Sequence, residues 1–160
     1  MNIRIRLSAL VLALLSAPLA SAGTPDAAKT LDYIHHAWGT LTRSMDNCAS
    51  LADPKIEGRP VIYVPAQFAV PADLQRTAKR CNVEVRPLPR VIRELGEVDA
   101  TKLPEQGLLY LPHPYVVPGG FFNEMYGWDS YFIVLGLLHD GKTHLAKAML
   151  NHQVYQIRFY

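Results

Sequence analysis

The chain has 160 residues, enough for one domain with a modest hydrophobic core. It carries 16 Lys and Arg against 14 Asp and Glu, so its formal net charge is only +2. So small a charge gives no general electrostatic reason to bind nucleic acid or an acidic membrane. One group of basic residues has no aromatic residues interleaved for base stacking, and we interpret it as a solvated face: Arg76, Lys79, Arg80, Arg86, Arg90 and Arg93.

Residues 1–22 have the pattern of a secretory signal peptide. Arg4 and Arg6 form a positive start, Leu7–Leu15 is apolar, and Ala20-Ser21-Ala22 provides small residues before cleavage at Gly23. The apolar run is short for a membrane span, although an uncleaved anchor is the competing interpretation. We therefore expect an exported protein, periplasmic or secreted, without a stable membrane anchor.

Apolar residues at helical spacing predict an amphipathic helix over about 28–46. His35 and His36 are adjacent, so they diverge on a helix and are expected to be surface residues rather than ligands of one metal ion. Two cysteines, Cys48 and Cys81, follow in the exported part, where an oxidising compartment favours a disulfide over two buried thiols. Their spacing matches no metal-site pattern, and we expect no metal.

A small β-α-β unit is predicted next. Val61–Val64 has the β-branched composition of a strand, Pro71 opens a helix to about Arg80, and Val83–Val85 alternates like a second strand. Between the first strand and the helix there is no glycine-rich phosphate loop, so nucleotide binding has no support. A short helix near 90–95 and a strand over Leu108–Leu111 are further predictions.

Two longer helices are predicted at the end of the sequence. The first covers Trp128–His139 and ends at Gly141, with a proposed inner stripe of Tyr131, Phe132, Leu135 and Leu138. The second covers about 144–159 and begins after a possible cap at Thr143, with a proposed inner side of Leu145, Met149 and Ile157. Two helices with so short a connection form an antiparallel hairpin. The histidines of this region are expected on the surface or at helix ends: His139, His144 and His152.

The segment Pro118–Tyr131 combines a double-glycine turn with aromatic and acidic residues: PGGFFNEMYGWDSY. Flat rings can cover the apolar faces of a pyranose, and carboxylates accept hydrogen bonds from its hydroxyls. The segment also resembles the trehalase signature PGGRFxExYxWDxY. Every fixed position is matched except the arginine, which is Phe121 here.

This resemblance to the inverting trehalases covers about residues 110–160. It implies an (α/α)6 barrel that hydrolyses α,α-trehalose to glucose without a cofactor or metal, and acts as a monomer at full length. It also implies a glycone site lined by Phe122, Tyr126, Trp128 and Asp129, with Glu124 and Phe121 as further candidates. For Glu124, sugar contact and a structural role in holding the loop by accepting backbone N–H bonds are equally open.

The sequence also departs from the family pattern. Phe121 can neither carry charge nor donate a hydrogen bond to a sugar. The family's Asn-Phe of the last helix is His152-Gln153 here, and its general acid, general base and second signature, QWDxPxGWxP, are absent. We therefore expect no catalytic residue in this chain. Glu124 and Asp129 are a poor catalytic pair, because both come from one short segment on one side of the sugar.

The expected fold class is mainly α with a small leading α/β region, the N-terminal part of an (α/α)6 barrel. The expected domains are the signal peptide at 1–22, a leading region with the β-α-β unit at 23–106, and the truncated start of a glycosidase barrel at 107–160. The resulting hypothesis is a trehalase-like glycoside hydrolase whose present chain is inactive by itself. The alternative is a small exported, non-catalytic sugar-binding module, which the self-contained β-α-β unit favours.

Overall fold

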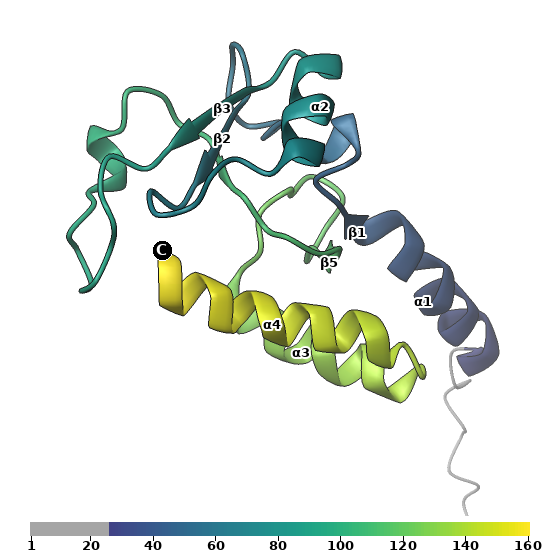
Figure 1. Ribbon diagram of the computed structural model, residues 1–160. Coiled ribbons are helices and arrows are strands. Elements are labelled where there is room, and N and C mark those ends of the chain that lie inside the picture. The colour runs from purple at the N-terminus through teal and green to yellow at the C-terminus, as the bar shows by residue number, and fades with distance from the viewer. Residues whose placement is uncertain (1–25) are drawn as a thin grey trace, which may run out of the picture. The chain divides into compact units, whose positions relative to one another are not determined.

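The computed structural model describes residues 26–160, so the predicted signal peptide and its cleavage site lie outside the described residues. The chain divides into two compact units, Met1–Tyr33 and Ile34–Tyr160. Of the first unit, the described part contains little more than the beginning of helix α1 (Ala27–Leu41); the second holds all the other elements (Figure 1). The described part is mainly helical with short strands, and none of its helices is long and apolar enough to cross a membrane.

Helix α1 ends at Leu41, so the predicted extension to residue 46 is wrong. The next two residues form strand β1 (Thr42–Arg43), which pairs antiparallel with β5 (Tyr115–Val116). The N–H of Val117 donates to the carbonyl of Leu41 at 3.1 Å, which extends this pairing. A strand more than 70 residues away therefore sets the end of the helix, and local sequence periodicity does not reveal it.

The predicted β-α-β unit is confirmed. Strand β2 (Val61–Val64), helix α2 (Ala72–Arg80) and strand β3 (Glu84–Pro87) build it, and β4 (Leu108–Leu109) adds a third strand in the order β3-β2-β4. Both neighbours run parallel to β2, and all four residues of β2 are buried, as expected of a central parallel strand. A Cβ at Gly107 would lie 2.4 Å from the Val61 carbonyl oxygen, so only glycine fits where β4 begins.

The predicted helix at 90–95 is wrong, because this segment is irregular. Pro87 and Pro89 remove backbone donors just before it, and Gly96 adopts a φ of 87° just after it. The nearest helical turn is the 3₁₀ segment η2 (Ala100–Lys102), where the Asp99 carboxylate caps the N–H of Thr101 at 3.0 Å.

Helices α3 (Gly127–His139) and α4 (Thr143–Phe159) form the predicted hairpin and lie side by side. Gly141 has a φ of 69°. Its N–H donates to Leu138 at 3.1 Å, and the N–H of Lys142 donates to Leu137 at 2.7 Å, the pair of bonds that defines a Schellman cap. The predicted glycine end of α3 is confirmed. Thr143 is the first residue of α4 and makes no side-chain cap, so that prediction is wrong.

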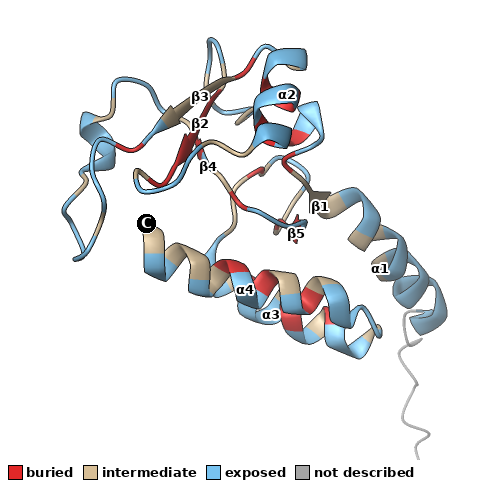
Figure 2. Cartoon of the chain, in the orientation of Figure 1, coloured by how far each residue is buried: buried red, intermediate tan, exposed pale blue. Residues whose placement is uncertain are grey.

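The predicted inner faces of this hairpin are partly wrong. In α3 the buried residues are Ser130, Val134 and Leu137, whereas the proposed stripe is exposed: Tyr131 (60%), Phe132 (53%), Leu135 (49%) and Leu138 (48%). In α4 Met149 is buried and Leu145 packs against the core, but Ile157 is 85% exposed. Figure 2 shows a few buried residues on each helix, with exposed and intermediate residues along the rest of both.

His152 is fully buried rather than at the surface, so its prediction is wrong, whereas His139 and His144 are exposed. The Nε2 atom of His152 lies 2.9 Å from the carbonyl oxygen of His113, and the His152 ring meets the Tyr115 ring edge-on at 5.9 Å. Nδ1 has no hydrogen-bond partner within the described part of the chain. Burial lowers the pKa of His152 to about 4, and the bond to the His113 carbonyl opposes that shift only in part.

Cys48 and Cys81 form a disulfide in this structure, with their Cα atoms 5.3 Å apart. The bridge joins the 3₁₀ turn η1 (Cys48–Ser50) to the end of α2. It therefore ties the segment that follows β1 to the β-α-β unit.

Replacing both cysteines, as Cys48→Ser with Cys81→Ser, should lower the free energy of unfolding. For residues 33 apart the chain-entropy model gives a loss of about 3–4 kcal/mol, because the unfolded chain becomes less constrained. Chemical denaturation followed by circular dichroism measures it, with reduced wild-type protein as the matched control. Equal midpoints for the oxidised wild type and the double variant would contradict a stabilising bridge.

His152 should make stability fall in acid. Its folded-state pKa of about 4 lies below the unfolded value of about 6.5, so the unfolded state binds the proton more tightly. The neutral His152 ring makes its full contribution to the free energy of unfolding above pH 6.5, and this contribution is lost as the pH falls toward 4. His152→Gln, which does not titrate, should have a smaller loss of stability over this window in denaturation curves. Parallel pH profiles for the two proteins would refute this role of His152.

Candidate functional site

The signature segment leaves β5 and ends in the first turns of α3. Its double-glycine turn is closed by the N–H of Phe122, which donates to the Gly119 carbonyl at 3.0 Å. Residues 119–126 are called the signature loop from here on. The aromatic and acidic residues of the predicted site therefore lie on one short loop and one helix start.

The aromatic side chains of the site form two groups, one on the signature loop and one on α3. The Phe122 ring meets Phe121 at 6.3 Å and Tyr126 at 5.5 Å, both edge to face, the geometry that aromatic pairs prefer. Phe122 is half-buried, whereas Phe121 is 59% exposed and Tyr126 is 39% exposed. Trp128 lies on α3, is 77% exposed and packs edge-on against Phe132. Exposed ring faces of this kind are suited to cover the apolar face of a sugar.

Glu124 is occupied by contacts within the protein. Its carboxylate accepts hydrogen bonds from the Lys55 ammonium, from the Tyr126 hydroxyl at 2.6 Å and from the N–H of Asn123 at 3.0 Å. Burial alone raises the pKa of Glu124, but these hydrogen bonds outweigh it and hold the pKa below its usual value. Glu124 thus stays ionised at neutral pH and is poorly suited to donate a proton as a general acid.

Asp129 has a different environment. It lies half-buried in the first turn of α3, where the helix dipole favours a negative charge. Within residues 26–160 no hydrogen bond or ion pair engages its carboxylate. Asp129 therefore remains free to accept hydrogen bonds from a ligand's hydroxyl groups.

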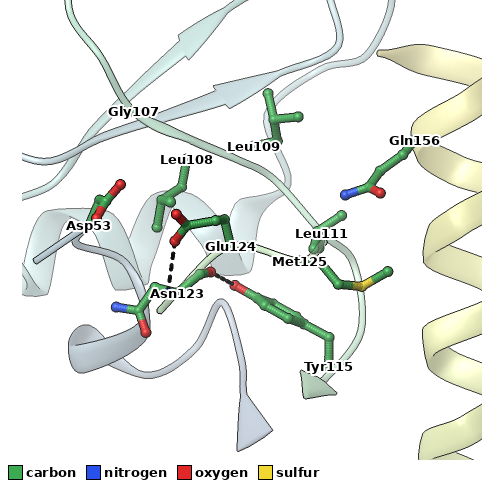
Figure 3. Close-up of a pocket in the computed structure, with 10 residues that line it drawn as sticks. All are labelled: Asp53, Gly107, Leu108, Leu109, Leu111, Tyr115, Asn123, Glu124, Met125 and Gln156. Atoms are coloured by element: carbon green, nitrogen blue, oxygen red, sulfur yellow. Dashed lines mark hydrogen bonds between the residues drawn. The ribbon is translucent and has the colours of Figure 1, made fainter. Parts of the chain in front are cut away.

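A cavity of about 160 Å³ lies behind the signature loop. Figure 3 shows Asn123, Glu124 and Met125 of the signature loop at this cavity. The rest of the lining comes from other segments: Asp53, Gly107, Leu108, Leu109, Leu111, Tyr115 and Gln156. Ligand pockets usually measure about 300–1,000 Å³, so this cavity is too small to be a disaccharide site by itself. In the described part of the chain no cluster of three His, Cys, Asp or Glu side chains could hold a metal ion.

Several residues that shape the loop had no signal in the sequence. Arg43 and Lys55 come from the segment before the sheet, and both reach the signature loop. Asn123 occupies a variable position of the signature and is nevertheless buried. Only a known contact between the two segments could have revealed these residues.

Comparison with known proteins identifies the family. The trehalase family model matches residues 63–160. A probable trehalase of Eremothecium gossypii is 35% identical over 153 residues, which covers 79% of this chain and 20% of that protein. A periplasmic trehalase of Xanthomonas axonopodis pv. citri is 41% identical over 103 residues, covering 61% of this chain and 17% of that protein. The cytosolic neutral trehalase of Saccharomyces cerevisiae is 35% identical over 152 residues, which covers 77% of this chain and 20% of that protein.

No solved structure matches the chain significantly. The chain spans about a fifth of the length of the curated relatives it matches. The family match lies on the sheet, the signature loop and the helical hairpin described above. The chain belongs to the trehalase family.

Proposed function

We propose that this chain forms part of a glycoside hydrolase that converts α,α-trehalose to glucose. The observation that carries the proposal is the signature segment, where exposed aromatic residues precede Asp129, whose carboxylate has no hydrogen bond or ion pair within residues 26–160. The names of the relatives support trehalose as the substrate. Phe122, Tyr126 and Trp128 are proposed to cover the faces of one glucose ring, and Asp129 to accept bonds from its hydroxyls.

We also propose that residues 107–160 contribute the first hairpin of an (α/α)6 barrel and that residues 23–106 form the leading region. The exposed apolar side chains of the hairpin support this, because a helix that is apolar on every side normally has partners all round. The side chains concerned remain exposed within residues 26–160: Trp128, Tyr131 and Phe132 of α3 and Leu150, Val154 and Ile157 of α4.

The chemistry of inverting hydrolysis needs two carboxyl groups about 6.5–9.5 Å apart, on opposite sides of the scissile bond. Glu124 and Asp129 come from one segment, and Glu124 is already bound by Lys55, Tyr126 and Asn123. Its lowered pKa further disfavours proton donation. We therefore assign Glu124 to holding the loop and Asp129 to binding, and we propose that the general acid and base come from other parts of the full-length enzyme.

Export is part of the proposal. The pattern of residues 1–22, the periplasmic relatives and the Cys48–Cys81 bridge support an oxidising compartment, although a cytosolic relative also matches. Mass spectrometry of the exported protein should find Gly23 at the mature N-terminus. A retained Met1 would contradict export by cleavage at this site.

Replacing Asp129 by Asn should weaken trehalose binding by the chain. A carboxylate that accepts hydrogen bonds from a sugar contributes about 1.5–3 kcal/mol, so the dissociation constant should rise about 10- to 150-fold. Isothermal titration calorimetry measures it, with Asp46→Asn, an exposed carboxylate outside the loop, as the control. Equal affinity of Asp129→Asn and wild type would remove Asp129 from the site.

The purified chain should release no glucose from trehalose. General acid and base groups each contribute typically about 10²–10⁴-fold in rate, so a site lacking both retains no useful turnover. Phe121→Arg, which restores the family's arginine, should strengthen binding without producing turnover. Glucose release that Asp129→Ala abolishes would overturn this assignment, and would make Glu124 and Asp129 the catalytic candidates.

A further inference from the structure

We propose that Arg43 and Asn123 together form a clamp that positions the signature loop for sugar binding, an inference that rests on the proposed function. The clamp consists of the Arg43 guanidinium, the Asn123 side chain and the backbone carbonyls that these two groups hold. It connects the loop to residues 43–52, which lie far from it in the sequence.

Arg43 uses its donors on backbone carbonyls and on Asn123. Its Nε donates to the Phe122 carbonyl at 3.2 Å and to Asn123 Oδ1 at 2.5 Å, and one terminal nitrogen donates to the Gly120 carbonyl at 3.1 Å. The other terminal nitrogen donates to the Thr40 carbonyl at 2.9 Å, at the end of α1. The planar fork of a guanidinium suits such divided donation, which a lysine cannot reproduce.

Asn123 completes the connection. It is only 6% exposed, and its Nδ2 donates to the carbonyls of Ala49 at 2.8 Å and Ala52 at 2.5 Å. Its own carbonyl accepts the Tyr115 hydroxyl at 2.6 Å, and its N–H donates to Glu124, as Figure 3 shows. All the polar atoms of this residue are therefore engaged, which is what a buried amide requires.

The segment that holds the loop is itself anchored. Strand β1 pairs Arg43 with Tyr115 of β5, and the disulfide at Cys48 joins the 3₁₀ turn η1, which contains Ala49, to the end of α2. Because β5 and α2 both hold the segment that carries Arg43 and Ala49, the clamp fixes the signature loop relative to β5 and the β-α-β unit.

A second contact fixes the aromatic side of the loop. Lys55 pairs with Glu124 and with Asp53 and lies 5.1 Å from the centre of the Phe122 ring. Glu124 in turn accepts the Tyr126 hydroxyl. The clamp sets the backbone of the loop, and this ion pair sets two of the rings that we assign to the sugar.

Arg43 does not take over the role of the arginine that Phe121 replaces. The donors of Arg43 already bind backbone carbonyls and Asn123, whereas the Phe121 side chain is exposed. Arg43 is therefore a positioning residue. A loop ordered before the sugar arrives loses less conformational freedom on binding, which favours affinity.

Hydrogen–deuterium exchange on the full chain tests the clamp. Arg43→Lys keeps the charge and loses the fork, so the amides of Phe122 and Asn123 should exchange about tenfold faster, with those of α3 and α4 unchanged. Trehalose affinity should weaken by a similar factor. Arg80→Lys is the matched control, because Arg80 also donates to a backbone carbonyl, that of Asp46 at 2.8 Å, outside the loop.

The outcomes separate the clamp from the proposed function. Loop amides that exchange at the wild-type rate in Arg43→Lys overturn the clamp, as does a uniform rise across both helices, since Arg43 would then support the whole fold. If Arg43→Lys fails to fold, Asn123→Asp, which still accepts from Arg43 but cannot donate to Ala49 and Ala52, must show the same local increase. A wild-type chain that does not bind trehalose refutes the proposed function, while the exchange rates still decide the clamp.

Discussion

The buried side chain of Asn123 must keep its hydrogen bonds, because an amide removed from water without partners costs about 1–3 kcal/mol. In this structure those partners are Arg43 and the carbonyls of Ala49 and Ala52. Asn123 directly precedes the part of the signature segment that contains Glu124, Tyr126 and the start of α3. The position of the site therefore depends on a contact between two segments about 70 residues apart in the chain.

The two acidic residues of the signature segment, Glu124 and Asp129, have different surroundings. Glu124 is surrounded by donors of the protein, which lowers its pKa and keeps it within the loop. Asp129 has no such partners in the described part of the chain, and in the sequence it directly follows Trp128, the most exposed aromatic residue of the site. Two carboxylates five residues apart thus differ in their surroundings, which is why we propose different roles for them.

Local patterns were enough to predict many elements but few contacts. The buried run at Val61–Val64, the helix after Pro71 and the glycine at 141 each have a signal within a few residues, and the structure confirms them. Strand β1 and the burial of His152 depend on pairing with distant segments, which no local pattern contains. The face of α3 could not be read from periodicity, because that helix is apolar on nearly every side.

For the site too, local sequence patterns predicted residues but not the contacts between distant segments. The signature identified the residues that we assign to the sugar, but its variable position hid Asn123, and no motif marks Arg43 or Lys55. For Glu124 the sequence left sugar contact and a structural role open. The bonds from Lys55 and Tyr126 favour the structural role.

The two tryptophans provide the most direct test of a sugar site on the signature segment. Trp38 donates from its indole to Asp140 at 2.5 Å, whereas the Trp128 ring is 77% exposed at the start of α3. In a titration with trehalose followed by ¹H–¹⁵N NMR, the indole resonance of Trp128 should shift and that of Trp38 should stay in place. A Trp128 resonance that does not move at saturating trehalose, or equal shifts of both indoles, would contradict the account.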